Sequence, residues 1–408
     1  MSVYLGIDWS ENKHDVVWMN EAGAILARLV IEHSPAGFGK LTETNQTLQL
    51  DAGSVLVGLE TDHNLLIDYL WGHNYRQIYV IPPSVVKSSQ GRYGSSGSIH
   101  DPKAAQLIAD ILRTDRQRLR PWLPDSLLTR QMRAKVSLIL SLTQEVTRLS
   151  NRLRAVLLRY YPAALAVFKG GLASQITLTF LQTYPDPTQA QQLTREDFAA
   201  FACREGYPKD QVGKCFARLQ ADYPQASSDT RQIYQSEAQL LATLLLPIYQ
   251  AELHERRSLA KLFTQHPDQA IFASLPGTGQ FLAPALCAKF GDDRQRFQQP
   301  GSVQALAGTC PVTAASGKSR WVHFRRGCDR EWRYICQLWA KSLLSNEESA
   351  LATAYFGKLR ARGHSVSHAY RCVANRWLAV AWKLWQTHTV YDPAIHFQHV
   401  SARSRLRS

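Results

Sequence analysis

The residues V-Y-L-G-I-D at positions 3–8 decide the fold class, because an apolar run of strand-forming residues ends directly on an acid. Valine, tyrosine and isoleucine are typical of extended strands. Runs of the same kind occupy residues 14–18, 25–31, 54–59 and 77–81, while residues 64–72 indicate a helix. Strands followed by a strand–helix–strand unit predict an α/β sheet domain over residues 1–125.

Helical periodicity dominates residues 126–265. Apolar residues spaced alternately three and four apart are Ile139, Leu142, Val146, Leu149, Leu153, Val156 and Tyr160, which is the seam of a coiled coil. A second helical pattern covers about residues 230–263, with Leu241, Leu244, Ile248 and Ala251 on one stripe. Pro247 is expected to kink or interrupt it. We predict an antiparallel coiled-coil arm with an insertion at about 162–228; the alternative is a compact helical bundle.

The remaining segments are a flexible loop, a helix and a C-terminal domain. Residues 87–99 are rich in glycine and serine and predict a flexible loop. Asp101 and Pro102 are suited to cap and open a helix that runs to about residue 113. Residues 266–390 predict a mainly helical domain, and residues 391–408 a loose basic tail.

Composition points to a nucleic-acid partner. The 408 residues include 47 Lys and Arg against 33 Asp and Glu, a formal charge of +14, while 45% hydrophobic residues suffice for a packed core. Chains this basic meet nucleic acid or anionic membranes. No apolar run is long enough to span a bilayer and the N-terminus soon becomes charged, which favours nucleic acid. Seven cysteines without a C-x-x-C pair indicate reduced thiols rather than a zinc ribbon or disulfide framework.

Three acids stand where a metal site could form. Asp8 follows the first strand, Glu60 follows the second strong strand, and Asp101 opens the next helix. Sheet domains of this class place their sites at the carboxyl edge of the strands. Carboxylates that converge there could hold Mg²⁺ for phosphoryl transfer. Taken singly, each acid also has a plain interpretation as a turn residue, a surface acid or a helix cap.

The segments around these acids resemble one family. GIDWSENKHD (6–15), GLETDH (58–63) and HDPKAAQLIADILR (100–113) are similar to the DEDD RuvC-like domain of the IS110 family of insertion-sequence recombinases, the Piv/MooV-like transposases. The resemblance implies an RNase H-like fold and a Mg²⁺ site made by Asp8, Glu60 and Asp101. Ala104 stands where the family carries its fourth acid.

How the site is completed at Ala104 stays open. Asp110 lies nine residues after Asp101, on the opposite side of the helix, and is a poor replacement. His100 could instead supply a neutral imidazole. Otherwise the site uses three carboxylates, or binds one ion more loosely.

The C-terminal blocks SLPGTGQFLAPALCAKFGDDRQRF (274–297), ALAGTCPVTAASGKSR (305–320) and FRRGCDREWR (324–333) resemble the second conserved domain of the same family. The family's nucleophilic serine lies in P-x-x-x-x-S-G, which falls on Ser316. A serine that attacks phosphorus needs positive charge nearby, and arginine matches phosphate geometry. The nearby cations include Lys318, Arg320, Arg325, Arg326, Arg330 and Arg333. The alternative is that S-G-K-S is a loop on a basic DNA-binding face.

Two further features concern nucleic-acid contacts. Gly277 and Gly279, in P-G-T-G before a helix, could present backbone N–H groups to a phosphate. Aromatic residues interleaved with basic ones are Trp332, Tyr334, Trp339, Trp377, Trp382 and Trp385. Some could stack on bases, but most tryptophans at helical spacing are expected in the core.

The resemblance implies a DNA recombinase that joins Ser316 covalently to DNA, guided by a bridge RNA and assembled as dimers or tetramers in synapsis. Its expected location is the bacterial cytoplasm, at the nucleoid. A hydrolytic RuvC-like nuclease or junction resolvase, with Ser316 only structural, is the second hypothesis. A catalytically impaired nucleic-acid-binding protein is the third.

Overall fold

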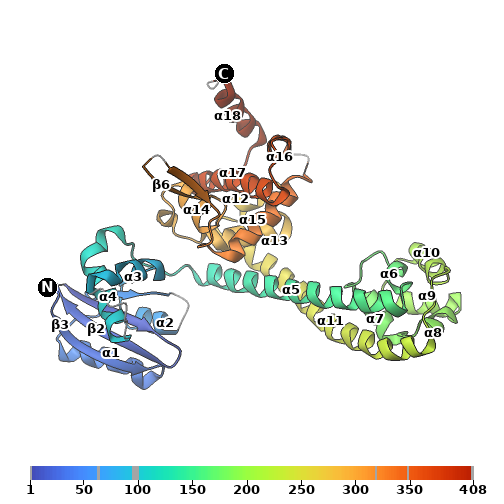
Figure 1. Ribbon diagram of the computed structural model, residues 1–408, viewed down its shortest axis with the longest axis horizontal. Coiled ribbons are helices and arrows are strands. Elements are labelled where there is room, and N and C mark those ends of the chain that lie inside the picture. Colours follow the sequence, from blue (N-terminus) through green and yellow to red (C-terminus); the bar gives the residue numbers. More distant parts are fainter. Residues whose placement is uncertain (1, 62–64, 94–100, 318, 347–348, 406–408) are drawn as a thin grey trace. The chain divides into compact units, whose positions relative to one another are not determined.

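The computed structural model describes residues 2–61, 65–93, 101–317, 319–346 and 349–405, with side chains omitted at 92–93, 101–103 and 400–405. The chain divides into two compact units, residues 1–124 and 125–408 (Figure 1). Within the described ranges, no helix combines the length and apolar character that crossing a membrane requires.

The first unit contains a five-stranded sheet in the order β3-β2-β1-β4-β5. The strands are β1 (Val3–Trp9), β2 (Lys13–Asn20), β3 (Ile25–Glu32), β4 (Leu56–Leu59) and β5 (Gln77–Val80). β1, β2 and β3 form antiparallel pairs, whereas β1, β4 and β5 run parallel. The five predicted strands and the mixed α/β class are confirmed.

Helices cover both faces of this sheet. α1 (Pro35–Thr47) and α2 (Leu65–Gly72) pack with Leu5 and Ile7 on one face. α3 (Pro83–Ser89) and α4 (Asp101–Asp115) pack with Tyr4 and Leu56 on the other. Neighbouring residues of a strand point to opposite faces. The even-numbered residues of β1 therefore face α4.

α4 runs antiparallel to β1. A Cβ built on Gly6 would lie 2.0 Å from the carbonyl oxygen of Ala105, so only glycine permits this approach. Arg113, near the end of α4, donates to the carbonyl oxygen of Glu21, which follows the β2 residue paired with the start of β1. The beginning of α4 therefore lies at the carboxyl edge of β1.

Helix content in this unit exceeds the prediction. Residues 35–47 form α1, which the sequence patterns did not indicate, with Ser34 accepting from the Gly37 amide as the N-cap. Residues 87–99 were predicted as a loop, but Lys87–Ser89 end α3 and Gln90–Tyr93 form a 3₁₀ turn. Residues 94–99 lie outside the described part.

The second unit is built on a pair of long antiparallel helices, α5 (Leu127–Tyr160) and α11 (Ser228–Phe263). Salt bridges Lys135–Glu255 and Arg152–Glu237 fix the antiparallel register. α11 continues through Pro247, so of the expected kink or interruption the interruption is wrong. Its predicted stripe is also displaced: Leu241 is buried, but Leu244 and Ala251 are exposed.

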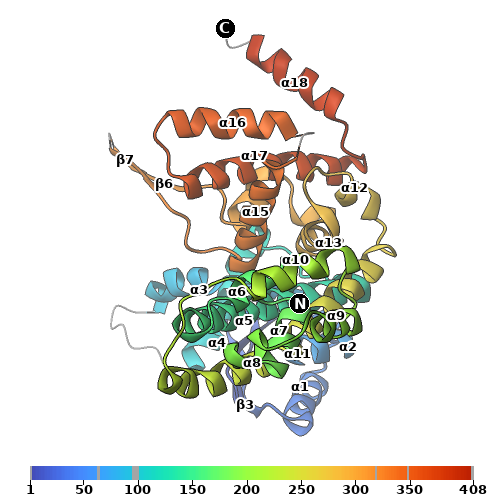
Figure 2. The ribbon, with the colours of Figure 1, turned by 90° about the vertical axis from the view of Figure 1, so that its right-hand side faces the viewer.

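The helix pair carries a separate core at each end. At one end it packs with α6 (Ala164–Val167), α7 (Gln175–Thr183), α8 (Pro187–Gln191), α9 (Arg195–Arg204) and α10 (Lys209–Leu219), as Figures 1 and 2 show. At the other end it packs with α12 (Gln269–Ala273), α13 (Gly279–Phe290), α14 (Pro300–Leu306), α15 (Arg330–Leu343), α16 (Ala350–Ala361) and α17 (Val366–Thr387). A polar contact separates the cores: Glu252, which is buried, accepts from Thr143 and Arg256.

Two elements of the second unit were not predicted. β6 (Val312–Ser316) and β7 (Ser319–His323) form a hairpin within a domain expected to be mainly helical. α18 (Pro393–Arg405) occupies most of the segment predicted to be a loose tail.

Candidate active site

Asp8 and Glu60 lie at the carboxyl ends of the neighbouring parallel strands β1 and β4. The last paired residues of β1 and β4 are Ile7 and Leu59, and each acid follows at the next position. Gly6 and Gly58, two residues earlier, both face α4 closely. Because strand side chains alternate, Asp8 and Glu60 project to this same face. Burial raises the pKa of Glu60 above its ordinary value.

Asp15 adds a third carboxylate to this edge. It lies directly opposite Asp8 in the β1–β2 pair, so both side chains share the α4 face. Asp15 is buried and Asp8 is half-buried. Across the described residues, no three His, Cys, Asp or Glu side chains are arranged so that they already form a metal-binding cluster.

Next to Asp15, His14 lies buried on the opposite face of the sheet. Its Nε2 is 3.0 Å from Nδ1 of His33, and its Nδ1 accepts from the Ser10 amide. Burial, followed by repulsion from His33, lowers the pKa of His14 to about 4. His14 is therefore neutral at physiological pH.

The third predicted acid, Asp101, begins α4 at the carboxyl edge of β1, but its side chain lies outside the described part, as does His100. Ala104 is half-buried one residue before Ala105, which covers Gly6. Asp110 is buried and pairs with Arg113 at 2.6 Å, in the half of α4 further from this edge. It therefore does not take the place of the acid missing at Ala104.

Ser316 is the last residue of β6, at the tip of the hairpin. It pairs with Ser319, and the turn between them contains Gly317 at φ +55°. Lys318 lies outside the described residues. Ser316 is exposed, and none of the described residues hydrogen-bonds to its hydroxyl. Every residue of β6 and β7 is exposed, and Figure 2 shows the hairpin projecting from the helices.

Arginines hold the base of the hairpin. Arg325 donates to the carbonyl oxygens of Cys310 and Pro311, just before β6. Arg333 donates to the Arg325 carbonyl and to Cys328 Sγ. The Arg333 and Arg371 guanidiniums lie 4.9 and 4.7 Å from the centre of the Phe324 ring, which is exposed. Two arginines expected to bind nucleic acid thus also support the hairpin.

The charge around the hairpin is unbalanced. Arg320 lies on β7 and Arg326 follows it, and both are exposed. Within the described ranges, no ion pair joins a carboxylate to Arg320, Arg325, Arg326, Arg333 or Arg371. Such a group of cations favours an anionic partner.

The turn at Gly277 and Gly279 precedes α13. Gly277 has φ +70°, and a Cβ added to it would lie 3.0 Å from the backbone nitrogen of Leu343. Packing therefore requires glycine at this position. Gly279 begins α13 and has open space around it. A cleft of about 860 Å³ lies beside the start of α13. Its lining includes Gln280, Phe281, His254, Arg256, Arg257 and Lys261, so it carries several cations.

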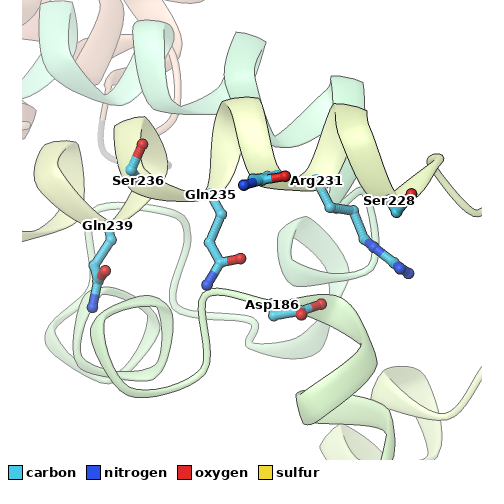
Figure 3. A pocket seen from close by; sticks show the side chains of 7 residues that line it. Asp186, Ser228, Arg231, Gln235, Ser236 and Gln239 are labelled. Carbon is cyan, nitrogen blue, oxygen red and sulfur yellow. The ribbon is translucent and has the colours of Figure 1, made fainter.

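A second, smaller pocket of about 260 Å³ lies on the arm (Figure 3). Its lining is polar and comprises Asp186, Ser228, Arg231, Gln232, Gln235, Ser236 and Gln239. Arg231 donates to Thr188 Oγ1 at 2.8 Å, which ties α11 to α8. The sequence assigned no role to the insertion at about 162–228, which contributes Asp186 to this pocket.

The aromatic residues divide as expected, with one omission. Trp332, Trp339, Trp377 and Trp385 are buried core residues, and Tyr334 is exposed. Trp321 was not singled out, although 65% of it is exposed on β7. In S-R-W-V-H (319–323) the side chains alternate between two exposed faces of the hairpin. The sequence therefore shows no apolar pattern that would mark Trp321. Asp15 and Arg371 were missed because only tertiary pairing brings them to these places.

Comparison with protein families gives two matches. A family model described as Transposase, the DEDD domain of IS110 elements, matches residues 5–162. A second, described as Transposase IS116/IS110/IS902 family, matches residues 269–355. Together they include Asp8, Glu60, Asp101 and Ser316.

Curated relatives are similar over nearly the full length. The mini-circle putative transposase for IS117 of Streptomyces coelicolor is 28% identical over 399 residues, 96% of each chain. The insertion element IS900 uncharacterized 42 kDa protein of Mycobacterium paratuberculosis is 26% identical, covering 96% of this chain and 98% of that protein. The insertion element IS110 uncharacterized 43.6 kDa protein of S. coelicolor is 24% identical over 96% of each chain. With both conserved domains present in order, the chain belongs to the IS110 family of insertion-sequence transposases.

Proposed function

We propose that this transposase recombines DNA through a covalent phosphoserine link to Ser316. The observation that carries the proposal is the position of Ser316: an exposed serine at the tip of a hairpin whose surrounding arginines have no described carboxylate partner. Positive charge of this kind stabilises the oxyanions that develop when a serine attacks phosphorus.

The first unit is proposed as the RuvC-like domain that holds a divalent cation. The donor set fits Mg²⁺, because Asp8 and Glu60 present hard oxygen ligands from adjacent strand ends and α4 begins with Asp101 at the same edge. A cation bound there would supply Lewis-acid stabilisation of the scissile phosphate. Asp15, opposite Asp8, places a further carboxyl group beside these two ligands.

The chemistry at Ser316 takes two displacements. The Ser316 Oγ attacks a DNA phosphate, and one P–O bond to the leaving strand breaks as the Oγ–P bond forms. The leaving oxygen takes up a proton, and the Ser316 hydroxyl gives one up. The hydroxyl end of a partner strand then attacks the phosphoserine, which restores Ser316 and joins the strands. Arg326, which is exposed just after β7, would hold the phosphate during both displacements.

Each part of the chain has a proposed role in binding nucleic acid or a second protomer. Residues 1–125 would form the nuclease domain, 126–265 a coiled-coil arm, 266–390 the serine domain and 391–408 a basic segment. The arm would bring protomers together as dimers, which pair in synapsis. The net charge of +14 is compatible with DNA together with a structured bridge RNA.

The test compares Ser316→Ala with Ser319→Ala. Ser319 pairs with Ser316 across the hairpin, so this control removes a hydroxyl from the same turn. Each protein, with the RNA that copurifies with it, is incubated with DNA carrying the ends of its own insertion sequence and Mg²⁺. We expect a protein–DNA adduct, mapped to residue 316 by mass spectrometry, in wild type and Ser319→Ala. Strand cleavage that survives in Ser316→Ala would refute the proposal and favour a hydrolytic nuclease.

Sequencing the copurified RNA tests the guide. A single discrete RNA encoded beside the gene is the expected result. Heterogeneous host RNA would contradict a guide RNA without affecting the role of Ser316.

A further inference from the structure

The two faces of the β6–β7 hairpin carry different side chains. Ser316 pairs with Ser319, Ala314 with Trp321 and Val312 with His323, and directly opposite residues share a face. The other face carries Thr313, Val322, Ala315 and Arg320. Because strand residues alternate, Trp321 lies on the same face as Ser316.

Trp321 has no partner within the described chain. Its exposed fraction is 65%, and no ring contact, cation–π contact or hydrogen bond joins it to another described residue. A two-stranded hairpin is marginally stable in water on its own. A large indole kept in the open on such a hairpin indicates that a partner covers it.

The charges around the hairpin select the partner. Arg320 precedes Trp321 on β7 and projects from the other face of the hairpin, Arg326 follows β7, and neither arginine has an ion pair with a described carboxylate. A protein surface that covered the indole would also have to neutralise these cations. A nucleic-acid strand can both cover the indole and neutralise the arginines, because its bases have flat faces and its phosphates are negatively charged.

We infer that Trp321 is a base-stacking residue, which holds one nucleobase of the DNA strand and thereby positions the adjoining phosphate at Ser316. This inference rests on the proposed function. Trp321 lies two residues from Ser319, the partner of Ser316, which is about 7 Å along a strand. One nucleotide can bridge that interval, with its base on the indole and its phosphate at the hydroxyl. Trp321 is a positioning residue, since the indole has no group that reacts with phosphorus.

The first measurement locates the base. DNA carrying the ends of the insertion sequence, with iododeoxyuridine placed at successive positions around the cleavage site, is bound to Ser316→Ala protein and irradiated. We expect a crosslink to residue 321, identified by mass spectrometry, from one or two adjacent positions. A crosslink only to residues outside the hairpin would overturn the inference.

The second measurement uses three variants in the active protein. Trp321→Ala should lower the yield of the Ser316 adduct ~5- to 100-fold, the range for loss of one stacked base. Trp321→Phe should restore most of it, because a phenyl ring also stacks. The matched control is Val322→Ala, which truncates a residue of similar exposure (62%) on the other face of the same hairpin.

A DNA containing an abasic nucleotide at the crosslinking position completes the test. It should depress the wild-type adduct yield to the level of Trp321→Ala and leave that variant unchanged. Equal yields from wild type and Trp321→Ala would refute stacking while the phosphoserine mechanism stands. Absence of any adduct in wild type would instead refute the proposed function, whatever the crosslink shows. A change of oligomeric state in Trp321→Ala, without a crosslink, would assign the indole to a protein contact and overturn the inference.

Discussion

Asp8 of β1 lies directly opposite Asp15 of β2, and both carboxylates project toward the face covered by α4. Glu60 follows at the neighbouring position on β4. Like charges placed opposite each other weaken a sheet. Two ionised carboxylates at paired positions would repel each other, and a cation bound between them would relieve that repulsion.

Removing one of these charges should stabilise the metal-free protein. We expect Asp8→Asn to raise the free energy of unfolding of the first unit by ~0.5 kcal/mol without divalent cations. The stabilisation that Mg²⁺ gives the wild type should disappear in the variant. Thermal melts with and without Mg²⁺ measure both effects. A lower melting temperature for metal-free Asp8→Asn would show that the carboxylate is needed for folding.

As the pH falls, metal binding should begin to weaken at a higher pH than it would with a glutamate of ordinary pKa. Burial raises the pKa of Glu60, so its carboxyl takes up a proton earlier as pH falls, and the protonated form does not bind a cation. Titration calorimetry with Mn²⁺ at several pH values measures the decline. In Glu60→Gln the affinity should be low throughout and lose this dependence. A decline in affinity centred below the usual glutamate pKa would contradict the raised pKa of Glu60.

The first unit should lose stability between about pH 6.5 and pH 4. His14 is neutral in the folded protein with its pKa lowered to about 4, whereas in the unfolded chain it titrates near 6.5. In this interval the unfolded state binds more protons, so stability rises with pH and is lost on acidification. Urea unfolding at a series of pH values measures the slope, which His14→Gln should reduce. An unchanged slope would assign it to other groups.

Gly6→Ala should destabilise the first unit by about 3 kcal/mol, at the upper end for overpacking. The added methyl would meet the Ala105 carbonyl oxygen at 2.0 Å, which is backbone and cannot turn aside. The control is Gly39→Ala in α1, where the methyl meets nothing within 4 Å. That change should be neutral or stabilise by ~0.5–1 kcal/mol. Chemical denaturation of both variants decides it, and equal effects would refute the close contact of α4.

Arg325 and Arg326 are adjacent in the sequence, but replacing each with alanine should have a different effect. Arg325 holds the carbonyl oxygens of Cys310 and Pro311, so Arg325→Ala should speed hydrogen exchange throughout residues 312–323. Arg326 is exposed, so Arg326→Ala should leave exchange unchanged and lower the salt dependence of DNA binding by about one phosphate contact. Identical exchange in the two variants would show that Arg325 does not anchor the hairpin.

The sequence predicted the strands of the first unit well, since Leu5 and Ile7 alternate with residues facing the other side. The helices of the arm were also predicted by apolar spacing. α1 was missed because its residues 35–47 contain two glycines and few apolar side chains, and its cap at Ser34 is a weak signal. The stripe on α11 was misplaced because small residues such as Ala238 and Ala242 make the contact.

The candidate site was less accessible to prediction. Asp8 and Glu60 could be singled out because each directly follows an apolar run, which is a local pattern. Asp15 stands inside a strand pattern, and only the register of β1 with β2 brings it opposite Asp8. Trp321 belongs to a hairpin with no buried face, so its exposure follows from tertiary structure alone.

The buried contact of Glu252 with Thr143 divides the long helix pair into two cores that touch different parts of the chain. On one side of this contact the helix pair packs with α12 to α17, and on the other side with α6 to α10. Matched insertions of seven residues in α5 and α11 would lengthen the arm by about 10.5 Å while keeping the same faces inward. The span between the two cores is thus a length that can be changed in steps of two helical turns while each core keeps its own contacts.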